Sequence, residues 1–421
     1  MLNGDKTGMK IWIVSVGEPL PTDGVNTRLR RMGNLAAFIA QNSDNQVDWF
    51  SVSFDHYKKK QRVEKSTTVD LADNYRMHIL RTNGYKRNVS IARIIHHIMG
   101  SKMIYRAMCN MEEKPDIILA SMEPLEMSSI STAFADKFGV PVIVDVRDLW
   151  PEIYYEVIPK KLHFLLDLYV GYCSRVLRKT MSRANAIVGL SPDFLKYGLK
   201  YARRDRTPMD AVIPIAYPNY DYAPYKGKYD QLKEKYGICE DDFVAVFFGN
   251  FGNQFAFEPI VEAAHKLTAY SKIKIVLCGT GIQMDDIKAR CPDNVIFPGW
   301  IEKAEIMSLS ANAAVGIAPY IDSMNYRMNT PNKFGEYLSA ALPPVIAVGG
   351  LMQEMLNEAG CGAKYDDGES LANILLSYYE DAKKLQDESM RARALYEKRF
   401  SGDVVNQEFV NQIERLIKPE D

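Results

Sequence analysis

The segment from Thr330 to Gly350 places a lysine and a glutamate in the first two turns of an apolar helical pattern. Pro331 suits the first turn of a helix, where N–H groups lack partners within the helix. These N–H groups and the helix dipole favour an anion, and Lys333 adds positive charge suited to a diphosphate. Glu336, one turn beyond Asn332, can accept two hydrogen bonds from a ribose diol. The sequence therefore indicates a nucleoside diphosphate site, and the alternative is an exposed Lys–Glu pair on a helix surface.

Glycine-rich segments follow three predicted strands in the same half of the chain. Gly249 and Gly252 follow the first strand, Gly279 and Gly281 follow the second, and Trp300 comes directly after the third. Ligands of open α/β sheets bind beyond the carboxyl ends of the strands. Glycine lets the backbone approach a ligand closely, and the next helix start supplies N–H groups. A single glycine after a strand is usually only a turn, but three such segments at one edge favour a nucleotide.

Two series of alternating strands and helices position these residues. The strands are short, β-branched and nearly all apolar, which is typical of strands buried on both faces of a parallel sheet. Repeated β–α units predict an α/β protein with one doubly wound sheet in each half. The first series has strands beginning near Lys10, Val47, Met77, Asp116, Val140 and Ala186, and the second near Asp242, Ile273, Asn294, Ala313, Pro344 and Gly362.

The chain has 421 residues, too many for one hydrophobic core. The Pro- and Tyr-rich segment 214–230 lacks clear periodicity and is typical of a linker. We predict an N-terminal domain over residues 1–215 and a C-terminal domain over residues 216–390. Residues 391–421 form an amphipathic helical pattern, which we expect to pack back toward the N-terminal domain.

Composition excludes several classes of function. The formal net charge of -1 gives no global field that would attract nucleic acid, so we expect no nucleic-acid partner. The six cysteines form no C-x-x-C pair, which argues against a zinc site and for a reducing compartment. The first apolar run, Ile11 to Val16, is too short for a signal-peptide core, and no run reaches the length of a membrane span. We therefore expect a cytoplasmic protein.

One segment is locally basic. Residues 74–111 contain no acidic side chain, and basic charge beside an apolar helical face suits an anionic membrane surface. The segment 162–170, with its flanking lysines and arginines, could extend this surface. The alternative is an ordinary helix whose apolar face lies in the core. The residues concerned are Arg76, Arg81, Lys86, Arg87, Arg93, Lys102 and Arg106, with Ile91, Ile94, Ile95, Ile98, Met99, Met103 and Ile104.

Several of these motifs together resemble a known family. The chain is similar, from about residue 10 to 415, to the retaining nucleotide-sugar glycosyltransferases of family 4, which have the GT-B fold of two Rossmann-like domains facing a cleft. Its N-terminal half resembles a subgroup that assembles bacterial O-antigen and capsular polysaccharide. The resemblance rests on Phe247–Asn250, Cys278–Gly281, Val295–Trp300 and Pro331–Ala347 in the second half, and on Val52–Arg62, Gly84–Ser90, Asp145–Glu152 and Ser191–Arg204 in the first.

The resemblance implies roles for individual residues. Glu336 would hold the ribose. The phosphates and the sugar would be held by Lys333 and by the N–H groups of Thr330 to Asn332. The acceptor would bind to the N-terminal domain. The implied donor-binding residues are Gly249, Asn250, Gly252, Asn253, Gly279, Gly281, Trp300, Ile301, Arg327, Asn329, Thr330, Pro331, Asn332, Lys333 and Glu336. The acceptor-binding candidates are Asp23, Gly24, Asn26, His56 and Arg147.

The chain departs from the family pattern in three places. Met328 stands where many members have a first glutamate, so its sugar contact must come from Asn329 or the backbone. Asn253 and Gln254 replace a basic residue, which leaves phosphate neutralisation to Lys333 and Arg327. Leu342 replaces a glycine near the end of the Glu336 helix, so we do not expect a left-handed residue at that helix end.

The implied reaction breaks a glycosyl–phosphate bond. Stabilising the departing diphosphate needs cations and N–H dipoles, so we expect neither metal nor cofactor. The adjacent aspartate pairs at 241–242, 285–286 and 366–367 are typical of solvated or capping groups. No general base stands out. Asp148, which follows a strand, is our catalytic candidate beside Lys333 and Glu336.

We therefore predict a retaining hexosyl- or N-acetylhexosaminyltransferase. Its donor would be a nucleotide-sugar, with UDP the favoured nucleotide, and its acceptor a lipid-linked bacterial surface glycan. It would work at the cytoplasmic surface of the inner membrane, bound peripherally through the basic and apolar patch. Two alternatives stay open: a UDP-sugar epimerase of the same fold, and a nucleotide-sugar binding module without catalysis.

Overall fold

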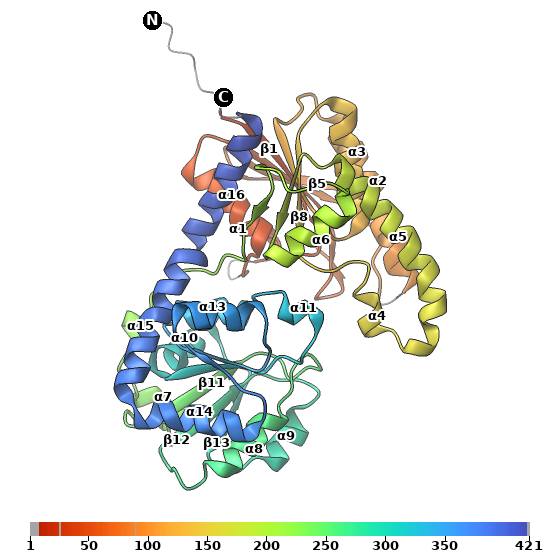
Figure 1. The fold of residues 1–421 in the computed structure, drawn as a ribbon. Coiled ribbons are helices and arrows are strands. Elements are labelled where there is room, and N and C mark those ends of the chain that lie inside the picture. The colour runs from red at the N-terminus through yellow and green to blue at the C-terminus, as the bar shows by residue number, and fades with distance from the viewer. Residues whose placement is uncertain (1–7, 25–26, 89, 419–421) are drawn as a thin grey trace, which may run out of the picture. The chain divides into compact units, whose positions relative to one another are not determined.

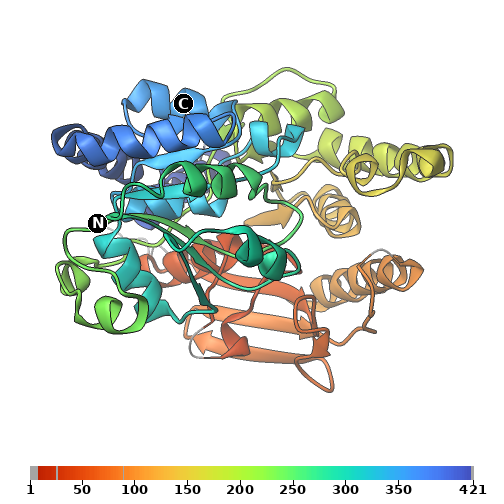
Figure 2. The same cartoon turned by 90° about the horizontal axis from the view of Figure 1, so that it is seen from below.

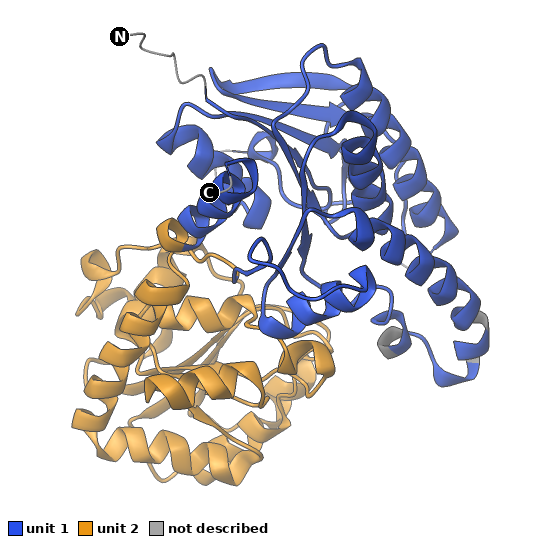
Figure 3. Cartoon of the chain, turned by 45° about the horizontal axis from the view of Figure 1, so that its top comes forward, with its two compact units in different colours: residues 1–214, 405–421 blue, residues 215–404 orange. Residues whose placement is uncertain are grey.

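The computed structural model describes residues 8–24, 27–88 and 90–418. The chain divides into two compact units (Figure 3): unit 1 comprises residues 1–214 and 405–421, and unit 2 residues 215–404. The division after Pro214 lies within the predicted linker. Among the described residues, none of the helices combines the length and the apolar composition needed to cross a bilayer.

Unit 1 is built on a sheet with the order β10-β9-β8-β7-β1-β2-β6-β5, and only β5 runs antiparallel to its neighbour. Figure 2 shows its red-to-orange strands side by side. The strands are β1 (Lys10–Val14), β2 (Gln46–Val52), β5 (Thr67–Ala72), β6 (Tyr75–Leu80), β7 (Ile117–Ser121), β8 (Val142–Val146), β9 (Ala186–Gly189) and β10 (Ala211–Val212), with a separate hairpin of β3 (Phe54–Asp55) and β4 (Lys60–Gln61). The helices are α1 (Arg31–Asn42), α2 (Ile91–Asn110), α3 (Leu125–Phe138), α4 (Tyr154–Val157), α5 (His163–Arg183), α6 (Pro192–Ala202) and α16 (Gly402–Ile417), with short 3-10 turns at Pro21–Asp23 and Lys160–Leu162.

Unit 2 has a fully parallel sheet with the order β13-β12-β11-β14-β15-β16 (Figure 1). Its strands are β11 (Phe243–Phe248), β12 (Ile273–Cys278), β13 (Val295–Gly299), β14 (Val315–Ala318), β15 (Pro344–Ile346) and β16 (Ala363–Lys364). Its helices are α7 (Asp230–Tyr236), α8 (Glu258–Lys266), α9 (Met284–Arg290), α10 (Lys303–Asn312), α11 (Met324–Arg327), α12 (Asn332–Ser339), α13 (Leu351–Ala359), α14 (Gly368–Glu380) and α15 (Ala382–Arg399), with a 3-10 turn at Ala223–Tyr225.

The predicted fold class is confirmed: both units are Rossmann-like α/β domains with parallel sheets. Central strands such as β7 and β8 are buried along their whole length, which explains their continuous apolar sequences. The edge strand β5 was not predicted. It alternates between half-buried and exposed residues, so its sequence lacks the apolar run of a central strand.

The C-terminal tail differs from the single helical element predicted over 391–421. It breaks at Phe400 and Ser401 into α15, which belongs to unit 2, and α16, which joins unit 1 from Val405. The Arg31 guanidinium lies 5.1 Å from the ring centroid of Phe409, and this contact holds α16 on α1.

Helix α12 ends in a way that the sequence analysis did not expect. Ala341 has a φ of 58°, in the left-handed region, and the Leu342 N–H donates to the Tyr337 carbonyl at 2.9 Å. The expectation against a left-handed residue at this end was therefore wrong. Alanine enters this region at a cost of about 1–2 kcal/mol, and Pro343 requires the chain to leave the helix at Leu342.

Gly316 on β14 fixes how closely α12 packs on the unit 2 sheet. A Cβ atom at this position would lie 2.2 Å from the ring of Tyr337, whose buried hydroxyl donates to the Ile317 carbonyl at 2.9 Å. We expect Gly316→Ala to lower the free energy of unfolding of unit 2 by about 1–3 kcal/mol because the ring must move.

Urea unfolding followed by circular dichroism measures this effect, with Gly171→Ala in α5 as the control. Nothing lies within 4 Å of a Cβ atom at Gly171, so alanine there should stabilise the helix slightly. Equal effects of the two substitutions would contradict this description of the packing.

Candidate functional site

The strand order of unit 2 reverses between β11 and β14, and ligands of such sheets bind at the carboxyl ends of strands where this happens. The Lys333 side chain, from the first turn of α12, reaches the end of β11. Its ammonium donates to the Phe248 carbonyl and lies 4.8 Å and 5.2 Å from the ring centroids of Phe247 and Phe255. The lysine is only 8% exposed. A Cβ atom at Gly249 would lie 2.5 Å from the Lys333 Nζ, so a side chain there would displace the ammonium.

The turn before α12 presents a further polar group. Asn329 and Thr330 are buried, and the Asn329 Oδ1 accepts the Thr330 backbone N–H at 2.8 Å. Within the described part of the chain, the buried Thr330 hydroxyl has no hydrogen-bond partner. Pro331 is the N-cap of α12 and supplies no side-chain cap. A buried hydroxyl without a partner next to a helix N-terminus suits a bound polar ligand.

Glu336 lies one turn further along α12 and is half-buried. Its negative charge contributes to the raised pKa values of Tyr222 and Tyr337, for which burial is the main cause. Among the described residues, its carboxylate has neither a hydrogen bond nor an ion pair, so both oxygens are available to a ligand. Lys333 and Glu336 thus lie three residues apart on α12, and Thr330 lies in the turn directly before this helix.

The glycine loops pack against each other. A Cβ atom at Gly279 would lie 1.7 Å from the Gly249 carbonyl oxygen, and one at Gly281 would lie 2.6 Å from the Phe251 nitrogen. The Phe251 N–H donates to the Thr280 carbonyl at 2.9 Å. Close packing of the two loops therefore explains why glycine stands at these positions, whether or not the loops also contact a nucleotide.

The remaining donor candidates differ in their surroundings. Arg327 is exposed and forms an ion pair with Asp322. The Trp300 indole, after β13, is 73% exposed, whereas the Ile301 side chain belongs to the hydrophobic core and could offer a ligand only its backbone. Three candidates, Asn250, Asn253 and Asn332, are exposed, and Gly252 lies beside the Gln254 side chain.

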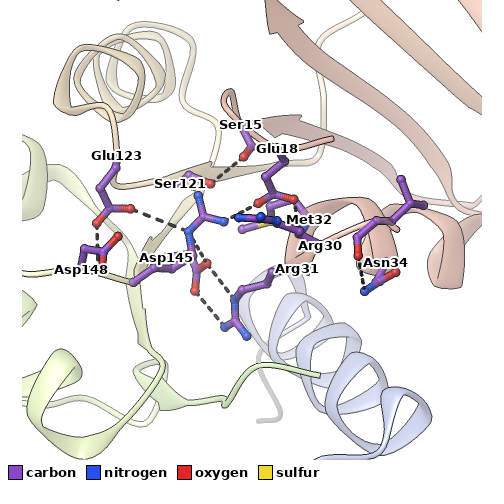
Figure 4. A network of polar contacts seen from close by, with 12 residues as sticks. Ser15, Glu18, Arg30, Arg31, Met32, Asn34, Ser121, Glu123, Asp145 and Asp148 are labelled. Carbon is purple, nitrogen blue, oxygen red and sulfur yellow. Dashed lines mark hydrogen bonds and ion pairs between the residues drawn. The ribbon is translucent and has the colours of Figure 1, made fainter. Parts of the chain in front are cut away.

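Unit 1 gathers charged residues at its own switch point, where the strand order reverses between β7 and β1. Figure 4 shows Glu18, Glu123 and Asp148, which follow the strands β1, β7 and β8, in one network of polar contacts. Arg147 donates to Glu18, and its Nε lies 3.7 Å from the Glu123 Oε2 and 3.8 Å from the Asp145 Oδ2. The Asp148 backbone N–H donates to the Glu123 Oε1 at 3.2 Å. Asp148 and Arg147, both predicted from the sequence, therefore lie in one network.

Arg31 stabilises this network from the first turn of α1. Its guanidinium makes two hydrogen bonds of 2.9 Å with the buried Asp145 carboxylate and also donates to the Ile213 and Pro214 carbonyls. The second Glu18 oxygen accepts the Met32 N–H at 3.2 Å and so caps α1. Arg31 thus pairs with Asp145, and among the described residues Arg147 is the cation that contacts Glu18 and Glu123.

Burial raises the pKa values of two of these carboxyl groups. Burial and then the Asp148 charge raise the pKa of Glu123 to about 8. Burial raises the pKa of Asp148 to about 6, against the opposing effect of Arg147. The Glu123 Oε2 is buried and lacks a hydrogen bond among the described residues. The pair can therefore accept or hold a proton near neutral pH.

The other acceptor candidates lie elsewhere in unit 1. Asp23 is mostly buried and accepts two hydrogen bonds from Arg62, at 2.6 and 2.9 Å, so its carboxylate is engaged within the fold. Gly24, next to it, is exposed. Asn26 lies outside the described residues. His56 contacts the Tyr85 hydroxyl at 2.6 Å rather than the Arg147 network.

Sequence reasoning missed Glu18, Glu123 and Arg31. Each carboxylate follows a strand by two to four residues, which is a usable signal once the strand order is known. The order itself could not be read from the chain, so the three strand ends were not recognised as neighbours.

Comparison with known proteins decides the fold. Residues 228–395 match the family described as Glycosyl transferases group 1. The chain is similar to Anabaena Alr3699/HepE solved with UDP and glucose, with 14% identity, a TM-score of 0.61 and coverage of 96% of this chain and 99% of that one. The chain has the GT-B fold.

Other solved structures extend this likeness. Sucrose-phosphate synthase from Thermosynechococcus elongatus has 13% identity and a TM-score of 0.70, covering 98% of this chain and 100% of that one. WaaG, a glycosyltransferase involved in lipopolysaccharide biosynthesis, has 13% identity and a TM-score of 0.63 over the same shares. No curated protein sequence matches the chain. The family match supports a glycosyltransferase of the GT-B superfamily, and the structural likeness supports the fold.

The titration of the Glu123–Asp148 pair makes stability depend on pH. Both pKa values are raised in the folded protein, so the native state binds more protons than the unfolded state. The stabilisation is complete below the ordinary carboxyl pKa and is lost as pH rises through about 8. We expect the free energy of unfolding of unit 1 to fall over this interval, and Glu123→Gln to flatten the decline.

Denaturant titrations between pH 4 and 9 measure this slope. Glu64→Gln, at an exposed position, is the matched control. A slope that is the same in wild type, Glu123→Gln and the control would contradict the assignment.

Proposed function

We propose that the protein is a retaining glycosyltransferase of family 4 that moves a hexosyl or N-acetylhexosaminyl group from a nucleotide-sugar, with UDP as the favoured nucleotide. The observation that carries this proposal is the buried Lys333 ammonium at the end of β11, with the Thr330 hydroxyl, unpaired among the described residues, just before α12 and the half-buried Glu336 one turn along it. The group 1 match over residues 228–395 supports the same reaction class.

The chemistry follows from the charges at this site. The barrier to glycosyl transfer lies in separating an oxocarbenium-like sugar from a departing diphosphate. The Lys333 ammonium and the helix N-terminus stabilise the negative charge that develops on the leaving group. Glu336 accepts hydrogen bonds from the ribose hydroxyls and fixes the nucleotide. Retention of configuration is taken from the family resemblance, and independence from metal stays a prediction.

Asp148 is the proposed acceptor-side residue. Its carboxyl group follows β8, with Glu123 as its neighbour, and a pKa near neutrality lets it accept a hydroxyl hydrogen bond and proton. Arg147 would hold the pair in place through its contact with Glu123.

The proposed acceptor is a lipid-linked glycan of the bacterial surface, such as O-antigen or capsule, met at the cytoplasmic face of the membrane. Support comes from exposed apolar stripes on two helices of unit 1 that begin at the carboxyl end of its sheet. On α5, Phe164, Leu168 and Tyr172 repeat every four residues and are 67%, 79% and 60% exposed. On α2, Ile91 and Ile95 are 75% and 48% exposed. Nearby lysines and arginines favour an anionic bilayer.

A UDP-sugar epimerase of the same fold is the second candidate. The observation that favours it is the ionisable Glu123–Asp148 pair, because elimination and re-addition need such groups. The test incubates the enzyme with UDP-sugars, with and without a membrane lipid extract. UDP released only with the extract supports transfer, whereas interconverted UDP-sugar without an acceptor supports epimerisation. Tight binding without either product would contradict both enzymes and leave a binding module.

We expect Glu336→Ala to weaken UDP binding by about 1–3 kcal/mol, because the ribose loses a charged hydrogen-bond acceptor. Isothermal titration calorimetry measures the change. Glu358→Ala, at an exposed position on α13, is the control that should bind UDP normally. Unchanged UDP affinity in Glu336→Ala would remove the ribose role.

We expect the combined change Phe164→Ser and Leu168→Ser to reduce association with vesicles of anionic phospholipid, since two exposed apolar contacts are lost. Vesicle flotation measures bound protein. The control combines Ile282→Ser and Met390→Ser, which remove equally exposed apolar side chains from unit 2. If wild-type protein does not float with these vesicles, the membrane proposal is wrong.

A further inference from the structure

A second group of charged and aromatic side chains lies in unit 1, outside the Arg147 network. It is formed by the loop between β3 and β4, the segment that follows β6, the first turn of α2 and the residue before α1. We call it the Tyr85 cluster and define it as Arg30, His56, Tyr57, Lys59, Tyr85 and Arg93.

The buried Tyr85 ring organises the cluster. The Lys59 ammonium lies 4.6 Å from the Tyr85 ring centroid, and the Arg93 guanidinium lies 5.9 Å from it. The Tyr85 hydroxyl contacts the His56 Nδ1 at 2.6 Å. Arg30 donates to the Tyr57 hydroxyl at 2.6 Å and lies over that ring. Three cations are therefore held on aromatic faces, which orient them without neutralising them.

The Asp55 carboxylate, one residue before His56, already has partners within the fold. The Asp55 Oδ1 accepts the backbone N–H groups of Tyr57 and Lys58 at 2.8 and 2.9 Å, and its Oδ2 lies 3.6 Å from Arg62. The Arg93 Nη1 donates to the Asn88 carbonyl at 3.0 Å. The Arg93 Nε is buried and has no hydrogen-bond partner among the described residues. A buried guanidinium donor left in this state suits an anionic acceptor.

The neighbouring histidines report the excess of positive charge. Burial, followed by the charges of Lys59 and Arg93, lowers the pKa of His56 to about 4. Burial, followed by the Arg93 charge, lowers the pKa of His97 to about 3. Both histidines are therefore neutral at pH 7, because a further proton would meet like charges. The N-terminus of α2 adds its dipole, and its first turn has no acidic residue.

We propose that the Tyr85 cluster binds a phosphate or diphosphate group through Lys59, Arg93 and Arg30. The proposal rests on the proposed function in one respect: the anion is taken to be part of the acceptor. The Arg93 guanidinium also lies 5.8 Å from the Trp150 ring centroid, and Trp150 is two residues beyond Asp148. Ile91 and Ile95 are exposed and lie two residues before and after Arg93 on α2, so they could receive the apolar chain of a lipid diphosphate.

Calorimetric titrations of the full chain, in excess UDP to occupy the unit 2 site, test the proposal. The probes are inorganic diphosphate, geranyl diphosphate and geraniol. We expect both diphosphates to bind, and geraniol to bind at least about tenfold more weakly than geranyl diphosphate. Tighter binding of geranyl diphosphate than of inorganic diphosphate identifies a lipid-linked anion, and equal affinities identify a soluble one. Geraniol bound as tightly as geranyl diphosphate would overturn the anion site.

Two variants locate the binding. Lys59→Asn suits the left-handed backbone at this position, where φ is 53°, and Arg93→Gln keeps part of the stem. Each should weaken diphosphate binding by about tenfold. Lys102→Gln, an exposed change on the same helix, is the control and should have no effect. Unchanged affinity in Lys59→Asn and in folded Arg93→Gln overturns the proposal.

The readouts separate this proposal from the proposed function. Titration of UDP alone depends on unit 2, and its failure would count against nucleotide-sugar transfer. Diphosphate binding that depends on Lys59 would still establish the Tyr85 cluster as an anion site. If UDP binds normally but diphosphate binding is the same in wild type and both variants, the proposed function survives and the Tyr85 cluster proposal fails.

Discussion

The buried ammonium of Lys333 at the end of β11 is the constraint on which the candidate donor site depends. Burying a charge is costly, and here the Phe248 carbonyl and two phenylalanine faces offset that cost. The contact requires Gly249 to lack a side chain and α12 to approach the sheet closely, which Gly316 allows. Thr330 lies in the turn directly before the same helix, and Glu336 lies three residues beyond Lys333 on it. The position of α12, the glycine at position 249 and the site of the Lys333 charge therefore depend on one another.

Unit 1 also buries charged groups at the ends of its strands, but there most of the groups are carboxyl groups. Its switch point gathers Glu18, Glu123 and Asp148 near Arg147. The neighbouring Asp145 is neutralised by Arg31. Burial is the main cause of the raised pKa values of Glu123 and Asp148, and the Asp148 charge adds to the rise at Glu123. In the Tyr85 cluster cations are in excess, and burial followed by the charges of Lys59 and Arg93 lowers the pKa of His56. Unit 1 therefore combines a region that accepts protons with a region that favours anions.

The sequence predicted the fold class well, because the buried parallel strands are apolar runs separated by helical periods. It also predicted the helix that carries Lys333 and Glu336, whereas the binding roles of these residues stay predictions. It did not predict Glu123 or Glu18, whose importance depends on β1 and β7 being neighbours in space. The left-handed Ala341 and the break at Phe400 were also missed, because tertiary packing overrides local preference at both places.

The affinity ratio of UDP to uridine, measured by calorimetry in wild type and in Lys333→Met, tests the central claim most directly. Uridine lacks the diphosphate but keeps the ribose, so the ratio isolates the part of binding that the ammonium supplies. Methionine fills a similar volume without the charge. The account predicts a ratio about tenfold or more lower in Lys333→Met. An identical ratio in the two proteins would contradict it.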